Sequence, residues 1–187
     1  MKKITGMVAM MMLAGWGAQA LAEDANSFSG WLFTLDRMKE VRAVDNEQYA
    51  EECGACHFAY PPGLLPSQSW YKLLAPEALA DHFGENAELD DDVLAEIQQF
   101  AYTHAAEHSY YKRSRKIARA TADGSAPLRI TEVKYIKRKH HEIPKRMIKD
   151  NPDVQSLSNC NACHTQAEKG VFDNDTVNIP NYPDWDD

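Results

Sequence analysis

The stretch Cys53-Gly-Ala-Cys56-His57 returns near the other end of the chain as Cys160-Asn-Ala-Cys163-His164. The spacing Cys-x-x-Cys-His is the attachment signature of a c-type haem. Its two thiols add to the two vinyl groups of the porphyrin, and the histidine that follows becomes an axial ligand of the iron. The two motifs use all four cysteines of the chain. The sequence therefore predicts two covalently bound haem c groups, with Cys53, Cys56, Cys160 and Cys163 as attachment points and His57 and His164 as iron ligands.

Two other uses of cysteine compete with haem attachment. Four cysteines in an exported protein ordinarily suggest disulfides, and cysteine with histidine can also build a zinc site. Neither explains why each cysteine pair is directly followed by histidine in both motifs. Haem attachment is therefore the favoured interpretation.

The first 22 residues have the three parts of a secretory signal peptide. Lys2 and Lys3 supply a positive start, an apolar run covers 4–13, and Ala20-Leu21-Ala22 forms a small-x-small cleavage site. A membrane anchor is the alternative, but the apolar run is shorter than the roughly 20 residues that a span needs. We therefore expect cleavage after Ala22 and a periplasmic protein. No other long apolar run follows, so the mature chain is expected to have no membrane span.

Acidic and basic residues are separated along the mature chain. Residues 23–108 carry 4 Lys/Arg against 17 Asp/Glu, residues 109–149 carry 13 against 3, and residues 150–187 carry 1 against 8. Such runs most often form a solvated face. A basic block inside an acidic protein also suits docking to a redox partner or pairing with haem propionates. Nucleic acid is not expected as a partner in the periplasm.

The pattern of apolar residues and helix signals predicts a mainly α fold, in which two haems add apolar surface to a small core. We expect a haem 1 domain over 23–108, a basic linker over 109–127 and a haem 2 domain over 128–187. The linker prediction depends on its basic composition and on its end, Asp123-Gly-Ser-Ala-Pro127.

Local signals place several elements within these ranges. Short helices are expected behind an Asp45 cap and a Ser67 cap, and the loop 58–66 is kept from being helical by three prolines and a glycine. Residues 129–139 fit either a strand or a short helix. The clearest amphipathic helix begins after Asp90 and is expected to reach Glu107 or His108. A terminal arm is expected over 27–42, and the C-terminal tail is expected to be irregular.

The sixth ligand of each iron is expected to be histidine. A Met ligand would raise the reduction potential, but the mature chain contains only Met38 and Met147. His82 lies 25 residues after His57, and His140 lies 24 residues before His164. These two histidines are the favoured distal ligands. The alternatives are His104 for haem 1, because it lies on an apolar helix face, and His141 for haem 2; His108 is expected at the surface.

Several short motifs around the haem signatures make the chain resemble the dihaem cytochrome c family. The resemblance covers about 49–180 and implies a first half like a small class I cytochrome c, a less regular second half and bis-histidine ligation. It also implies electron exchange with a small oxygen-binding monohaem cytochrome c or a membrane b-type cytochrome. Pro76 and the doubled His140-His141 depart from the family pattern. The motifs are Tyr49…Glu52-Cys53-Gly-Ala-Cys56-His57-Phe-Ala-Tyr60-Pro61, Leu64-Leu65-Pro66, Trp70, His82-Phe83-Gly84, Arg129-Ile130-Thr131, His140, Cys160…His164, Ala167, Gly170-Val171-Phe172 and Ile179-Pro180.

Two irons saturated by protein ligands leave no place for a substrate, so the expected function is electron transfer. The alternative is a haem enzyme, peroxidase-like or a small-molecule reductase, in which one iron is open and His104 or His141 acts as acid or base. A haem-based sensor is a third possibility, but no signalling module accompanies the haem motifs.

Overall fold

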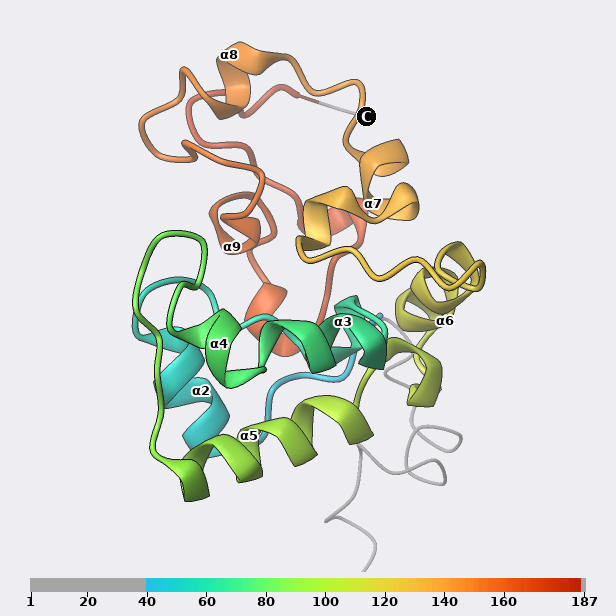
Figure 1. The fold of residues 1–187 in the computed structure, drawn as a ribbon. Coiled ribbons are helices and arrows are strands. Elements are labelled where there is room, and N and C mark those ends of the chain that lie inside the picture. Colours follow the sequence, from blue (N-terminus) through green and yellow to red (C-terminus); the bar gives the residue numbers. More distant parts are fainter. Residues whose placement is uncertain (1–39, 186–187) are drawn as a thin grey trace, which may run out of the picture. The chain divides into compact units, whose positions relative to one another are not determined.

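The computed structural model describes residues 40–185, which fold into short helices joined by long loops (Figure 1). Within this range no strand forms, and the β structure consists of two isolated bridges, His82 with Glu85 and His164 with Val177. The mainly helical fold is therefore confirmed. The predicted signal peptide and most of the predicted arm lie outside the described residues. The elements are α2 (Glu47–Gly54), η1 (Pro62–Leu64), α3 (Ser67–Leu73), α4 (Pro76–Leu79), α5 (Asp91–Thr103), η2 (Ala106–His108), α6 (Lys112–Ala120), η3 (Ile130–Glu132), α7 (Lys134–Lys139), α8 (Lys145–Ile148), α9 (Cys160–Cys163), η4 (Ala167–Lys169) and η5 (Asn174–Thr176).

Helix α2 leads the chain into the first haem motif. Its N-cap is Asn46, whose side chain accepts a hydrogen bond from the backbone N–H of Tyr49 at 2.6 Å. The expected cap, Asp45, instead pairs with Arg42 at 2.7 Å. Tyr49 is buried, and its hydroxyl donates to the Tyr60 carbonyl at 2.8 Å. This contact ties the helix to the proline-rich loop that follows His57.

The proline-rich loop at 58–66 is half-buried over 58–60 and buried over 61–66, although it is largely irregular. Leu64 and Leu65 are 2% and 1% exposed, and one turn of the loop, η1, is a 3₁₀ helix. The buried indole of Trp70 in α3 donates to the Pro62 carbonyl at 2.8 Å. The same carbonyl also accepts the 3.2 Å hydrogen bond from the Leu65 N–H that closes η1, so a side chain and the backbone satisfy it together.

Helix α5 lies beside α3 and presents an apolar face to it (Figure 1). The buried side chains of α5 are Leu94, Ile97, Phe100 and Ala101. The helix ends at Thr103, earlier than expected, and a separate turn, η2, follows over Ala106–His108. The backbone N–H of His104, its C-cap, still bonds to the Phe100 carbonyl at 3.2 Å.

The range 109–127, predicted as a linker, contains a packed helix. Ser114 and Ile117 in α6 are 0% exposed, while most of the basic side chains of α6 lie on its other faces. Helix α6 contacts α7, η1 and η2. Residues 129–139 form η3 and α7, so the helical alternative is the observed one.

The C-terminal residues return to the start of the described chain. The Gly170 carbonyl accepts hydrogen bonds from the backbone N–H groups of Glu40 and Val41 at 3.1 and 3.0 Å. Beyond α7 the chain is mostly irregular, with α8 and α9 only four residues long each. Among residues 40–185 no helix has both the length and the apolar character required to cross a bilayer.

Candidate functional site

The first haem motif begins in the last turn of α2, which carries Cys53, and continues into the following loop. The Nδ1 atom of His57 lies 2.8 Å from the Phe58 carbonyl oxygen. Because a carbonyl only accepts, Nδ1 is the protonated nitrogen in this arrangement. Nε2 then carries the lone pair that can bind a metal.

The ring of His82 lies opposite the ring of His57. The two ring centroids are 6.4 Å apart, and the ring planes differ by 28°. A metal-to-imidazole nitrogen bond is about 2 Å long, and each nitrogen lies about 1.2 Å from its ring centroid, so two axial imidazoles place their centroids about 6.4 Å apart. The spacing of His57 and His82 therefore fits one iron bound between them.

A strained turn holds His82 in this position. His82 and Glu85 exchange backbone hydrogen bonds of 2.7 and 3.3 Å across Phe83 and Gly84, both of which have positive φ (57° and 104°). Positive φ at both central positions is the requirement of a type I′ turn. It is uncommon for a bulky residue such as phenylalanine. Gly84 therefore supplies the second positive-φ position of this turn.

Arg129, from the second half of the chain, covers the Phe83 ring. Its guanidinium carbon lies 3.9 Å from the ring centroid, within the range of a cation–π contact. The Phe83 ring meets the His82 ring at 4.9 Å between centroids. Burial, together with the nearby His57 and Arg129, lowers the pKa of His82. Arg129 thus favours the neutral imidazole, the form that binds a metal.

The alternative ligand for haem 1, His104, lies at the end of α5. Its Nδ1 is 2.8 Å from the Phe100 carbonyl, and its ring packs on the Phe100 ring at 4.6 Å between centroids. The ring contacts of His57 are instead with Tyr60 and His82. His108 is exposed in η2.

The second motif has the same kind of paired histidines. Helix α9 carries Cys160 and Cys163, and His164 follows it. His140 caps the C-terminus of α7, with Nδ1 2.9 Å from the Ile136 carbonyl oxygen. The centroids of the His140 and His164 rings are 6.0 Å apart, and their planes differ by 77°. This spacing also fits a single iron between two imidazoles.

A cavity of about 410 Å³ surrounds this second pair. Both cysteines of the motif and both paired histidines line it. The remaining wall is largely apolar, as a porphyrin face requires. His141 also lines the cavity, but it is exposed and its Nε2 lies 3.5 Å from Glu142. The apolar lining residues include Ile130, Ile136, Ile148, Val154, Phe172 and Ile179.

Burial is the main cause of the pKa shifts of three motif residues, Cys53, Cys160 and His164. It lowers the pKa of His164 to about 4, with further lowering by His140 and Arg113 and an opposing effect of Asp173. It also raises the pKa of the Cys53 thiol to about 12 and that of Cys160 to about 11. Before haem attachment these two thiols are therefore uncharged, and the His164 imidazole is neutral, as a metal ligand must be.

Of two residues near the sites, Tyr60 was noted in the sequence only among the motifs of the family resemblance, and Arg113 was not singled out as functional. The Tyr60 ring lies 4.9 Å from the His57 ring, and its hydroxyl donates to the Ser158 carbonyl at 2.6 Å. Arg113 is buried in α6 and lines the cavity of the second motif. The signal for Arg113 was its place four residues before the apolar Ile117, which puts both side chains on one helix face.

Comparisons with known proteins show which family the chain belongs to. The chain is 45% identical to the diheme cytochrome type c from Shewanella baltica OS155, with a TM-score of 0.62, over 75% of this chain and 98% of that one. It is 40% identical to the diheme cytochrome c from Rhodobacter sphaeroides, with a TM-score of 0.62, over 71% of this chain and 100% of that one. A comparison with curated proteins finds no match. The family described as Dihaem cytochrome c matches residues 49–172. The chain therefore belongs to the dihaem cytochrome c family and carries two covalently bound c-type haems.

Proposed function

We propose that this protein is an electron carrier whose two irons are both closed by pairs of histidines. His57 and His82 would hold the iron of haem 1, and His164 and His140 that of haem 2. The observation that carries the proposal is the spacing of the paired rings, 6.4 Å and 6.0 Å between centroids. Membership of the family supports haem-based electron transfer in general terms.

Bound haem supplies a one-electron Fe(III)/Fe(II) couple, and the residues of the chain govern how it is used. The carbonyls of Phe58 and Ile136 orient His57 and His140 through Nδ1. Occupation of both axial positions leaves no site for an exogenous ligand, which favours electron transfer over catalysis at the iron.

Each haem would belong to its own part of the chain. We propose a haem 1 domain that ends near His108 and resembles a class I cytochrome c, with α5 as its amphipathic helix. The haem 2 domain would begin near Leu128 and depend on its haem for much of its core, because its helices are short. Helix α6 lies between these parts in sequence and packs against η1, η2 and α7.

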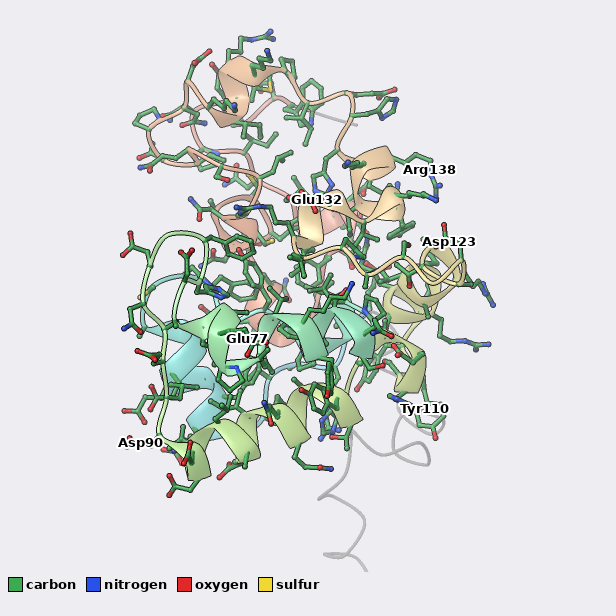
Figure 2. All side chains as sticks on the ribbon, viewed as in Figure 1. Glu77, Asp90, Tyr110, Asp123, Glu132 and Arg138 are labelled. Atoms are coloured by element: carbon green, nitrogen blue, oxygen red, sulfur yellow. The ribbon has the colours of Figure 1, made fainter. Side chains whose placement is uncertain are left out.

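The partner would dock on the basic surface, defined as Lys116, Arg119, Arg138 and Lys139 around Tyr135. These residues line an open groove of about 420 Å³ between α6 and α7, and Figure 2 shows Arg138 projecting outward from α7. Helix α7 ends at Lys139 and its C-cap is His140, so the basic surface adjoins the proposed distal ligand of haem 2. A redox protein with an acidic face would complement this basic surface. The resemblance indicates an oxygen-binding monohaem cytochrome c or a membrane b-type cytochrome.

The predicted signal peptide at 1–22 supports a periplasmic location for this carrier. Export would bring the chain to the compartment in which c-type haems are attached, and cleavage after Ala22 is the expected processing step. N-terminal sequencing of the protein from the periplasmic fraction tests this. A mature protein that begins at Met1 would refute it.

Carbon monoxide distinguishes a carrier from an enzyme with an open haem. The reduced dihaem protein is expected to bind carbon monoxide slowly or not at all, and its oxidised form is expected to give only low-spin EPR signals. Rapid binding at either iron, or a high-spin resting signal, would refute the proposal.

The docking role is tested by charge reversal and salt. Arg138→Glu is expected to slow electron transfer to an acidic cytochrome, and the rate of the unmodified protein is expected to fall as ionic strength rises. Lys72→Glu, an exposed change on α3, is the matched control and is expected to leave the rate nearly unchanged. Equal effects of the two variants would exclude the basic surface as the docking site.

A further inference from the structure

A buried ion pair joins the start of the described chain to α6. Glu40 and Arg113 are each 8% exposed. The guanidinium donates from Nε to the Glu40 carboxylate at 2.9 Å and also from Nη2 to the same oxygen. Their backbones are linked as well, because the Arg113 N–H donates to the Glu40 carbonyl at 2.9 Å.

The remaining contacts of Arg113 lead to the second haem site. Nη1 donates to the Tyr135 hydroxyl at 3.1 Å, and Nη2 donates to the Phe172 carbonyl at 2.6 Å. The Phe172 ring in turn meets the ring of His164 edge-on, with 5.3 Å between centroids. Arg113 itself lines the cavity that holds His140 and His164. Arg113 is therefore part of the wall of the second haem site, and Glu40 is its buried ion-pair partner.

Buried charges in the wall of the second haem site are expected to act on the iron more strongly than charges at the protein surface. Coulomb interactions are weakly screened where water is excluded. Lys137 and Lys139 also line the cavity, but both are exposed, so water screens them.

We propose that the Glu40–Arg113 pair sets the reduction potential of haem 2 and has little effect on haem 1. Reduction removes one positive charge from the iron centre, so a nearby cation favours the ferrous form and a nearby anion favours the ferric form. Glu40 offsets the cation and keeps the potential lower than Arg113 alone would. The inference rests on the proposed coordination of the second iron by His140 and His164.

The test measures the potential of each haem in the dihaem protein by spectroelectrochemical titration. Haem 2 is identified as the component whose potential rises in His140→Met, since a Met ligand raises the potential relative to His. Glu40→Gln is expected to raise the haem 2 potential and Arg113→Gln to lower it, each by about a tenfold change in the equilibrium constant, or about 59 mV. The double variant is expected to return close to the original value, and the conservative Arg113→Lys to stay near it.

The matched control is the exposed pair Lys134–Asp123, whose atoms are 2.8 Å apart and whose side chains are 72% and 52% exposed. Asp123→Asn is expected to leave both potentials unchanged. A purely structural role for Glu40 predicts the opposite sign, because loosened packing admits water and favours the charged ferric form. The direction of the Glu40→Gln shift therefore decides the question even if Arg113→Gln does not fold.

Three outcomes would overturn the inference. The haem 2 potential could fall or stay unchanged in Glu40→Gln, it could shift in the same direction in Glu40→Gln and Arg113→Gln, or the potentials of both haems could shift equally. Failure of the underlying coordination has a different signature. Rapid carbon monoxide binding by the unmodified protein would refute the bis-histidine site whatever the variants show. If the unmodified protein resists carbon monoxide but the variants leave both potentials unchanged, the role of the Glu40–Arg113 pair is refuted and the bis-histidine coordination is not.

Discussion

The Tyr60 hydroxyl donates a 2.6 Å hydrogen bond to the carbonyl of Ser158, a residue 98 positions further along the chain. Tyr60 follows the first haem motif by three residues, and Ser158 precedes the second by two. The Tyr60 ring also packs against the proposed ligand His57. One side chain therefore connects the two haem motifs.

Tyr60→Phe is expected to destabilise the dihaem protein by about 1 kcal/mol. The change removes the phenol O–H donor and leaves the Ser158 carbonyl without this hydrogen bond. Denaturant unfolding of the holoprotein provides the measurement. Tyr71→Phe is the matched control, since the Tyr71 side chain is 67% exposed and water can hydrate its hydroxyl. A loss in the control as large as in Tyr60→Phe would show that the contact with Ser158 contributes nothing.

The same tyrosine predicts a dependence of stability on alkaline pH. Burial raises the pKa of Tyr60 to about 12, against 10.0 for the unfolded chain. Between these values the unfolded protein has released the phenol proton and the folded protein has kept it, so stability falls as pH rises from about 10 to 12. The stability difference between the unmodified protein and Tyr60→Phe should shrink in this window. A difference that stays constant from pH 8 to 12 would contradict the prediction.

Replacement of the distal histidines separates ligands from their neighbours. His82→Ala is expected to open haem 1 to rapid carbon monoxide binding and to give a high-spin ferric signal. His104→Ala is the control: its ring packs on Phe100, so the haem spectra should be unchanged. At haem 2, His140→Ala is expected to open the iron and His141→Ala to leave it closed. Carbon monoxide difference spectra show which variant in each comparison opens the iron. If His104→Ala or His141→Ala opens the iron instead, the assignment of the distal ligand is reversed.

The two haems should differ in EPR although both have histidine pairs. The ring planes of His57 and His82 differ by 28°, and those of His140 and His164 by 77°. Nearly parallel imidazoles separate the energies of two iron d orbitals, whereas nearly perpendicular ones leave them almost equal. We therefore expect one ordinary rhombic low-spin signal and one highly anisotropic signal at low temperature. His140→Ala should remove the anisotropic one, and two identical rhombic signals would contradict this prediction.

Gly170 occupies a place that no other residue can fill without strain. Its φ is +75°, and a Cβ built on it would collide with the Val41 carbonyl oxygen. Gly170→Ala is expected to lose more than about 3 kcal/mol, because the strained φ and the collision add. The change would also disturb the hydrogen bonds that hold Glu40. Denaturant unfolding measures the loss.

Gly124→Ala is the control for the collision at Gly170. Gly124 also has a positive φ, +81°, but nothing lies within 4 Å of a Cβ built on it. It is expected to lose only about 1 kcal/mol, the contribution of the strained backbone. Similar losses in the two variants would show that close approach to Val41 is unimportant.

Local features of the chain were predictable from the sequence. The Cys-x-x-Cys-His motifs indicate two haems, because thioether attachment requires neighbouring residues and no distant partner. The apolar periodicity of 90–104 located α5, and only its end was misplaced, because the helix stops where His104 caps it. The basic run at 112–119 obscured α6, since its mean composition is polar and only one narrow face is buried.

The residues along the chain were enough to predict the cofactor, the family resemblance and a short set of candidate distal histidines. Which histidine rings face each other depends on tertiary contacts. The position of His82 opposite His57 depends on the turn at Phe83 and Gly84, and that turn is contacted by Arg129 from the other half of the chain. Glu40 and Arg113 form a buried pair across 73 positions. The distances between these side chains depend on long-range packing. The number of residues that separate them along the chain does not predict those distances.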